Sequence, residues 1–266
     1  GNPQFYILYG VIFILLVIVV IESTVLIVIF QKRKKITPAI KAPKAAVLKG
    51  KIAIVLDDWG YNLNNIPIAK SIRQPFTAAI LPNLPYSQEV ARFLHQSNKE
   101  IILHLPMEPN EKYRLENNTL LTAMPGSKIL EILNNDLDSV LFARGVSNHM
   151  GSKATSDGPT METILKELKK RKLYFLDSYV TGNSVVIEKA RLAGLPAVKR
   201  NIFLDNNSDP EYIRGQLYKL KMRARMYGNA VGIGHDRKNT LAVLKEMLPA
   251  MEKEGYKFVF VSEITG

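Results

Sequence analysis

Short apolar runs alternate with amphipathic stretches over residues 51–266. Eight runs have the length and composition of buried strands: KIAIVL (51–56), FTAAIL (76–81), EIILHL (100–105), RGVSNH (144–149), LYFLDS (173–178), AVKRNI (197–202), AVGIGH (230–235) and KFVFVS (257–262). Five stretches between them repeat apolar residues at helical spacing, over 86–97, 127–140, 160–172, 209–228 and 239–255. Nearly continuous apolar strands that alternate with helices are typical of a parallel sheet built from βαβ units.

The number of these units predicts how the sheet is arranged. Seven or eight strand–helix units within about 215 residues favour a distorted (β/α)7–8 barrel, because such a barrel accommodates this many parallel strands in a chain of this length. An open doubly wound sheet is the alternative. No internal repeat is visible, so we expect residues 51–266 to form one domain.

The N-terminal segment has a different pattern, because residues 5–30 are almost wholly apolar. The run is longer than the ~20 residues that a helix needs to cross a membrane, and Glu22 is its single charge. A cleaved signal peptide is the alternative, but no small-residue cleavage site follows the run. We therefore predict a transmembrane anchor at 5–30 and a flexible linker rich in Pro, Ala and Lys at 31–50.

Positive charge is concentrated near this segment. The chain carries a net charge of +12, of which residues 1–51 hold +7, so the predicted domain is only moderately basic. Basic and aromatic residues are not clustered within the domain, and we expect no nucleic-acid partner. The sequence QKRKK follows the apolar run directly, and by the positive-inside rule this flank would place the domain in the cytoplasm.

Composition excludes several kinds of chemistry. The chain has no cysteine, which excludes thiol catalysis, Cys-based zinc sites, iron–sulfur clusters and disulfides, and leaves His, Asp and Glu as metal ligands. Gly232-Ile233-Gly234 is too short for a dinucleotide fingerprint. The segment that begins at Asp205 resembles a calcium loop, but Pro210 and Gln216 replace the Gly and Glu that such a loop requires.

Polar residues gather where the predicted strands end. They are Asp57 and Asp58 after the first run, His104 and Glu108 at the third, Asn148 and His149 at the fourth, Asp177 at the fifth, Arg200 late in the sixth and His235 at the seventh. In a (β/α) barrel these strand ends meet on one face. A single Asp or His there is commonly a helix cap or a hydrogen-bonded core residue. The whole set predicts an Asp/His metal centre with additional acid–base groups.

Five motifs carry a family resemblance. IVLDDWGY, HLPMEP, NHMGS, YFLDS and GIGH, in this order and spacing, resemble the divergent polysaccharide deacetylase family, a distant branch of the NodB-type carbohydrate esterases. The resemblance covers about residues 51–266 and implies a distorted (β/α) barrel. It also implies metal-dependent removal of N-acetyl groups from a cell-envelope or extracellular polysaccharide, by a membrane-anchored domain outside the cytoplasm. That location is opposite to the one indicated by the QKRKK flank.

The resemblance implies roles for the residues that match the motifs. Asp57 corresponds to the catalytic base, Asp58 and His104 to metal ligands, and His235 to the general acid. The expected ion is a divalent metal, zinc in particular, because imidazole ligands suit zinc.

Some positions leave alternatives open. Glu108 stands where the relatives have a second metal-binding His, so we expect His149 to be the third ligand, with Glu108 as the alternative. Arg200 or Asp177 is expected to orient Asp57 or His235. Because that second His is replaced, a barrel that binds glycan or acts as an envelope scaffold without turnover is the alternative function.

Overall fold

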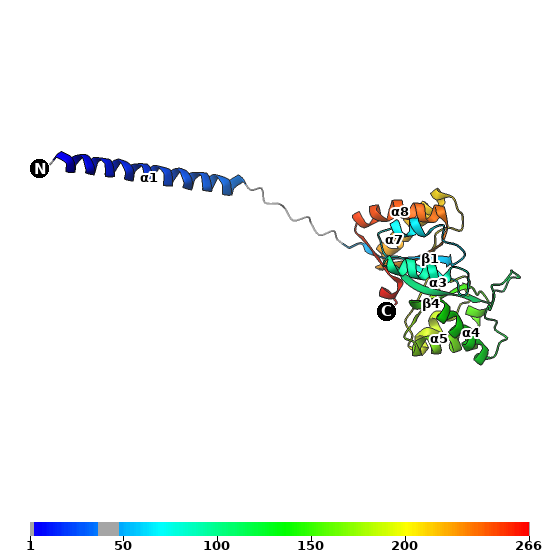
Figure 1. The fold of residues 1–266 in the computed structure, drawn as a ribbon. Helices are drawn as coiled ribbons and strands as arrows, with labels where there is room; N and C mark the ends of the chain where they lie inside the picture. The colour runs from blue at the N-terminus through cyan, green and yellow to red at the C-terminus, as the bar shows by residue number, and fades with distance from the viewer. Residues whose placement is uncertain (1–2, 37–47, 266) are drawn as a thin grey trace. The chain divides into compact units, whose positions relative to one another are not determined.

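The computed structural model describes residues 3–36 and 48–265 of the chain (Figure 1). The chain divides into two compact units, Gly1–Ala45 and Ala46–Gly266. In the first unit, helix α1 (Pro3–Ile36) contains the apolar run and ends six residues beyond Phe30, where the predicted linker begins. The middle of that linker, 37–47, lies outside the described residues. Over Pro3–Arg33, α1 is long and apolar enough to cross a membrane, a property that signal sequences share.

The second unit is built around one parallel sheet of nine strands. The strands are β1 (Gly50–Trp59), β2 (Thr77–Ile80), β3 (Glu100–Met107), β4 (Ala143–Met150), β5 (Tyr174–Asp177), β6 (Ala197–Lys199), β7 (Ile202–Phe203), β8 (Asn229–His235) and β9 (Tyr256–Val259). Their order is β6-β5-β4-β3-β2-β1-β8-β7, with β9 also paired to β1. All eight predicted runs contain strands, and the sixth is divided into β6 and β7.

The chain itself connects the two edges of this sheet. Edge strands β6 and β7 are consecutive in the sequence and are separated by Arg200 and Asn201. Arg200 donates its backbone N–H to the carbonyl of Asp177 in β5, and Asn201 donates to Val231 in β8. The sheet is therefore curled into a distorted barrel, as predicted, and is not an open doubly wound sheet.

Helices cover the outside of the curled sheet (Figure 1). They are α2 (Ile66–Ser71), α3 (Ser87–Gln96), α4 (Gly126–Ser139), α5 (Gly158–Lys170), α6 (Val186–Ala193), α7 (Pro210–Tyr227) and α8 (Lys238–Lys253), with short 3₁₀ turns η1 (Ala154–Ser156) and η2 (Val261–Glu263). Five of these helices match predicted stretches. We did not predict α2 and α6, which at six and eight residues are too short for helical periodicity to stand out.

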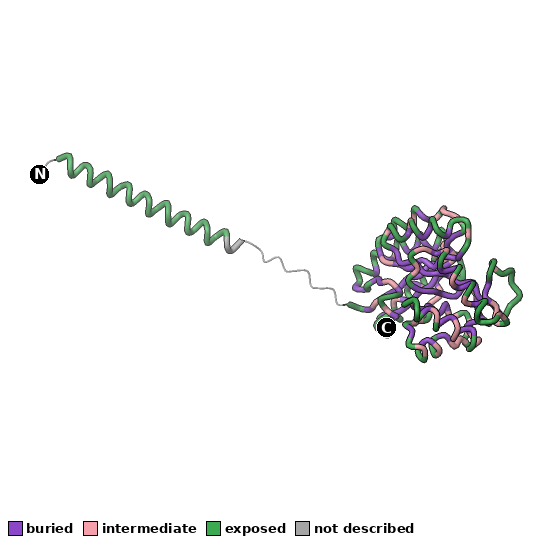
Figure 2. Tube along the Cα trace, turned by 60° about the horizontal axis from the view of Figure 1, so that its bottom comes forward, coloured by how far each residue is buried: buried purple, intermediate pink, exposed green. Residues whose placement is uncertain are grey.

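Figure 2 shows buried residues gathered inside the second unit. Strand residues alternate between two buried clusters. Ile52, Ile54 and Leu56 of β1 belong to the cluster that packs against the helices, whereas Ala53 and Val55 belong to a second cluster built from strands and the C-terminal segment. The second cluster fills the inside of the barrel. Side chains alternate along a strand. A polar residue at a strand end therefore faces the barrel interior when it is an even number of positions away from an inward-facing residue of the same strand.

Candidate active site

The alternation of side chains along each strand directs several of the predicted site residues to the mouth of the barrel. Asp57 continues the inward-facing series of Ala53 and Val55, and His235 continues that of Val231 and Ile233. Asp57 and His235 are also direct neighbours in the pairing of β1 with β8. By the same alternation, His104 follows Ile102 in β3. The carboxyl ends of these strands therefore bring one carboxylate and two imidazoles together.

Asp58 would point away from this cluster if β1 remained regular. However, the pairing of β1 with β2 shifts register between Leu56 and Trp59, and Asp58 has a φ of 65°. Asp adopts this left-handed conformation more readily than most residues. As a result, Nε2 of His104 lies 3.5 Å from Oδ2 of Asp57 and 3.4 Å from Oδ1 of Asp58. The irregularity places two consecutive carboxylates beside one imidazole.

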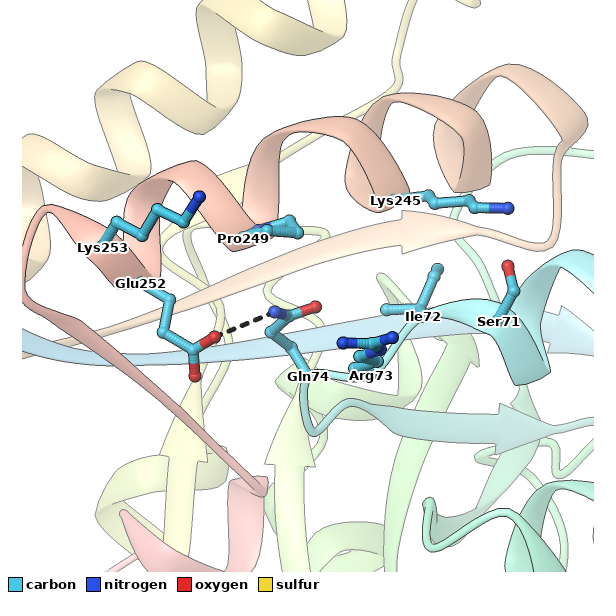
Figure 3. A pocket seen from close by; sticks show the side chains of 8 residues that line it. All are labelled: Ser71, Ile72, Arg73, Gln74, Lys245, Pro249, Glu252 and Lys253. Carbon is cyan, nitrogen blue, oxygen red and sulfur yellow. Dashed lines mark hydrogen bonds between the residues drawn. The ribbon is translucent and has the colours of Figure 1, made fainter.

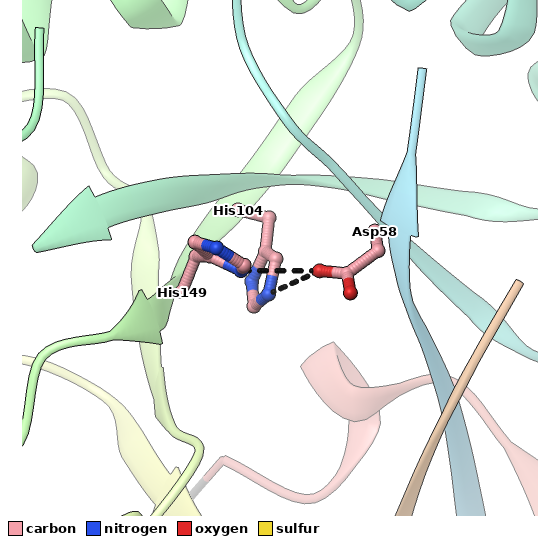
Figure 4. Close-up of side chains that lie close together, drawn as sticks. All are labelled: Asp58, His104 and His149. Carbon is pink, nitrogen blue, oxygen red and sulfur yellow. Dashed lines mark hydrogen bonds and ion pairs between the residues drawn. The ribbon is translucent and has the colours of Figure 1, made fainter. Parts of the chain in front are cut away.

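Asp58, His104 and His149 form a compact set of possible metal ligands (Figure 4). Nδ1 of His149 lies 3.1 Å from Oδ1 of Asp58, and one donor atom from each residue lies within 4.8 Å of the other two. Nδ1 of His104 lies 2.8 Å from Oγ of Ser147, which holds the ring with Nε2 toward Asp58. Two imidazoles and one carboxylate are a donor set that zinc uses in catalytic sites. The residues therefore fit a divalent ion.

The ionisation of these groups agrees with that fit. Burial alone would raise the pKa of Asp58, but its hydrogen bonds to His104 and His149 outweigh burial and hold this pKa well below its ordinary value. Burial lowers the pKa of His104 to about 4. The carboxyl of Asp58 is therefore ionised and the imidazole of His104 neutral near pH 7, which are the forms that bind metals.

Asp57 has the opposite electrostatic environment. Its side chain is 3% exposed, and Oδ1 has no hydrogen-bond partner among the described residues. Burial, together with the nearby carboxylates of Asp58 and Asp205, raises the pKa of Asp57 well above its ordinary value. Neighbouring carboxyl groups whose pKa values move in opposite directions are typical of divided acid–base roles. Asp57 thus offers a basic oxygen that no other group occupies.

His235 is held by Asp205, a residue that the sequence analysis did not select. Asp205 is fully buried, and its Oδ1 lies 2.8 Å from Nδ1 of His235. Its Oδ2 accepts hydrogen bonds from the backbone N–H of His235 and the hydroxyl of Thr240. The other ring nitrogen of His235, Nε2, lies 3.7 Å from Oδ2 of Asp58. The sequence analysis considered Asp205 only as the first residue of a possible calcium loop, and did not use its position two residues after a strand.

The structure does not bring Glu108 into the cluster of possible ligands. Oε2 of Glu108 accepts hydrogen bonds from the backbone N–H and the hydroxyl of Thr122, both at 2.7 Å. Oε1 pairs with Nζ of Lys153 at 2.7 Å. Glu108 therefore fastens the loop after β3 to the loop after β4, and His149 lies where a third donor could be offered instead.

Asp177 and Arg200 make their hydrogen bonds to other groups than those that we expected them to orient, although the positive charge of Arg200 acts to lower the pKa of Asp57. Asp177 has the parity of Phe175, which faces the helices, and it accepts hydrogen bonds from Ser184 and the backbone of Tyr179. Arg200 donates to the carbonyls of residues 178 and 179. Within the described part of the chain, neither side chain hydrogen-bonds to Asp57 or His235. The residue that orients the imidazole of His235 is Asp205, and not Asp177 or Arg200.

The hollows that lie outside the cluster on the described residues include two that are lined mainly by polar side chains. One, with a volume of about 590 Å³, lies between the α2–β2 connection and α8, where Gln74 bonds to Glu252 and Arg73, Lys245 and Lys253 also line the hollow (Figure 3). The other, of about 290 Å³, lies in the loops that follow β3, β4 and β5, which belong to the same rim as the cluster. Its lining is polar: Asn110, Thr122, Lys153, Ser156, Asp157 and Asn183. Amide and hydroxyl groups of this kind can hydrogen-bond to sugars.

Comparison with known proteins identifies the family and the fold. Residues 54–265 match the family described as divergent polysaccharide deacetylase. The uncharacterized Escherichia coli protein YibQ is 36% identical over 219 residues, which cover 82% of this chain and 69% of YibQ. An uncharacterized protein from Agrobacterium tumefaciens has a similar structure, with a TM-score of 0.78, 22% identity and coverage of 84% of this chain and 92% of that chain. A family 4 carbohydrate esterase from Streptomyces lividans, solved with acetate, shares the fold with a TM-score of 0.50, 14% identity and coverage of 83% and 97%.

Proposed function

The chain belongs to the divergent polysaccharide deacetylase family, and on this premise we propose that it is a metal-dependent hydrolase that removes N-acetyl groups from a cell-envelope or extracellular polysaccharide. The observation that carries the proposal is one cluster with three parts. Asp58, His104 and His149 offer metal ligands, Asp57 offers an unoccupied basic oxygen, and His235 is backed by a buried carboxylate. Hydrolysis of an unactivated amide needs all three parts.

Asp58, His104 and His149 would hold the ion. A divalent metal such as zinc, when bound there, supplies Lewis-acid chemistry: it polarises an amide carbonyl and acidifies water. The hydrogen bond partner of His104, Ser147, would keep the imidazole aimed at the ion, as groups behind metal ligands generally do. Glu108 has no part in this assignment, because both of its oxygens are engaged elsewhere.

Asp57 and His235 would move the protons. Oδ1 of Asp57 accepts a proton from the attacking water as the new C–O bond forms at the acetyl carbon. Nε2 of His235 donates a proton to the amine nitrogen as the C–N bond breaks, so that acetate and a free amino sugar are released. Asp205 holds Nδ1 of His235 and thereby keeps Nε2 directed toward the reacting groups.

The rim also offers a place for the sugar chain. The hollow lined by Asn110 and Asn183 lies on the loops beyond β3 and β5, on the same side of the barrel as the cluster. We propose that it binds a saccharide unit next to the one that reacts. The alternative function, glycan binding without turnover, depended on the missing second His, and His149 offers a donor in its place.

The test measures metal and turnover together in the purified full chain. The assay follows acetate release from N-acetylated chitooligosaccharide in the presence of zinc. We expect Asp57→Asn to keep its metal and to lose about 10²–10⁴-fold in rate, because a positioned base contributes about that much. His104→Ala should lose metal and activity together. The matched control is His95→Ala, since His95 is exposed on α3 and lies outside the cluster.

Two results would contradict the proposal. An Asp57→Asn protein as fast as the parent would remove the base from the mechanism. A parent chain that binds the oligosaccharide with zinc present but releases no acetate would favour the glycan-binding alternative.

We further propose that α1 is retained as a membrane anchor with the domain outside the cytoplasm. The chain has no cysteine, so a Leu192→Cys variant carries a single thiol, at a site that is 66% exposed. A membrane-impermeant maleimide should label this thiol in intact spheroplasts. Labelling only after lysis would place the domain in the cytoplasm, as the QKRKK flank indicates.

A further inference from the structure

The C-terminal half of α7 exposes a row of large apolar side chains. Tyr218, Met222 and Met226 are spaced four residues apart and are 57%, 38% and 71% exposed. Residues at this spacing lie along one face of a helix. The opposite face of α7 is buried, through Ile213, Leu217, Leu220 and Ala224. An exposed apolar row of this length on a surface helix is typical of an interaction site.

Cations flank this row. Lys219, Arg223 and Arg225 are exposed, and none of them forms an ion pair with another described residue. The guanidinium of Arg223 lies 4.7 Å from the ring centroid of Tyr227, which is also exposed. We call Tyr218, Met222, Met226, Lys219, Arg223 and Arg225 the α7 face. It combines apolar and aromatic groups with unneutralised positive charge.

The chain enters the domain at the C-terminal end of α7, on the buried side of the helix. The backbone N–H of Lys51 donates to the carbonyl of Gly228, which caps the C-terminal end of α7. Gly50 passes so close to the helix that a Cβ there would lie 2.4 Å from the carbonyl oxygen of Ala224. Thirteen residues, 37–49, separate the end of α1 from the start of β1. An α1 held in a membrane would therefore keep the α7 face at a high effective concentration near the lipid surface.

We propose that the α7 face lies on the surface of a bilayer that contains anionic phospholipids. Tyr218, Met222 and Met226 enter the headgroup region, where tyrosine is enriched, and the three cations face lipid phosphates. Anionic leaflets attract basic segments of this kind. A partner protein could offer similar chemistry. However, the chain that leads from α1 enters the domain at this end of α7, which favours lipid as the occupant. The inference rests on the proposed retention of α1.

The location of the face has a consequence for the proposed reaction. Gly228 and Lys51 lie at the beginning of β8 and β1, whereas His235 and Asp57 lie at the opposite ends of these strands. With the side of α7 on lipid, the mouth of the barrel lies at the far ends of these strands and stays free of the lipid contact. The site would then remain open to polysaccharide at the bilayer surface.

The experiment uses quenching by lipid in reconstituted vesicles. Because the chain has no cysteine, Met226→Cys provides a single site for an environment-sensitive fluorophore in the full chain. The variant is reconstituted into vesicles of phosphatidylcholine alone or of equimolar phosphatidylcholine and phosphatidylglycerol, with or without brominated chains. In the anionic vesicles we expect the bromines to remove about half of the fluorescence or more.

Matched controls separate the α7 face from the anchor. Leu192→Cys places the fluorophore on α6, at a similarly exposed site, and should be quenched little. Replacing Lys219, Arg223 and Arg225 with Gln, or adding about 0.5 M NaCl, should abolish most of the quenching at position 226 because charge is screened or removed. Flotation of the chain with phosphatidylcholine vesicles reports on α1 alone, so failure of the anchor and failure of the face are distinguishable. Equal quenching at positions 192 and 226, equal quenching in neutral and anionic vesicles, or none at 226 would overturn the proposal.

Discussion

A buried carboxyl group, Asp136 in α4, should make the stability of the domain depend on pH. Its side chain is fully buried, Oδ1 accepts a hydrogen bond from Asn83, and Oδ2 has no partner among the described residues. Burial raises the pKa of Asp136 from 3.8 to about 7. Between these values the folded state holds a proton that the unfolded chain has released. Stability is therefore lost as the pH rises toward 7.

The expected size follows from the shift. At about 1.4 kcal/mol per pKa unit, ionisation of Asp136 should cost the folded state about 2–3 kcal/mol between pH 5 and pH 8. Asp136→Asn keeps an oxygen for Asn83 but does not titrate. The free energy of unfolding of this variant, minus that of the parent, should therefore increase by about that amount over the same range.

Urea unfolding followed by tryptophan fluorescence measures this difference. Trp59 is the single tryptophan of the chain and is fully buried, so its emission reports on the domain core. Other titrating groups contribute equally to the parent and the variant and cancel in the difference. Asp138→Asn, at an exposed position of the same helix, is the matched control and should give a flat difference. A flat difference for Asp136→Asn as well would refute the reasoning.

Three further predictions concern the site. Asp205→Asn should lower the rate of acetate release by about 10²–10⁴-fold while the metal content stays constant, because the variant no longer holds the imidazole in one orientation; loss of metal in this variant would contradict a purely orienting role. Ser147→Ala should weaken zinc binding by about 10–100-fold in a competition titration, since it frees the ring of His104, and unchanged affinity would exclude that support. Asn110→Ala and Asn183→Ala should raise KM for an oligosaccharide and leave kcat unchanged, whereas a change in kcat alone would move the sugar-binding site elsewhere.

Much of the site could be predicted because strands alternate. Asp57, His104 and His235 share the parity of inward-facing apolar residues in their own strands, and barrel topology brings the ends of those strands together. The same alternation turns Asp177 away from the barrel interior, because it lies two residues after Phe175, which faces the helices. Our expectation that Asp177 orients the site considered its position at a strand end and ignored its parity.

Contacts between distant segments determined the rest. Glu108 was a candidate ligand in the sequence, but Thr122, later in the same loop, and Lys153, in the loop after β4, bind both of its oxygens. Asp205 became a partner of His235 because β7 pairs with β8, although thirty residues separate the two side chains. No local pattern shows which loops meet. Sequence reasoning therefore could not assign either residue.

The apolar pattern by itself determined the N-terminal helix, the parallel strands and the inward direction of Asp57, His104 and His235, because each depends on periodicity within one element. Only the tertiary structure decided how Asp58 reaches the cluster and that Asp205 stands behind His235. It also engaged Glu108 with other residues, which leaves His149, the ligand that we expected, as the third possible donor. These outcomes depend on a register shift in one strand and on hydrogen bonds between loops. Such contacts form only when the whole barrel closes, because their free energy depends on groups that the sequence places far apart.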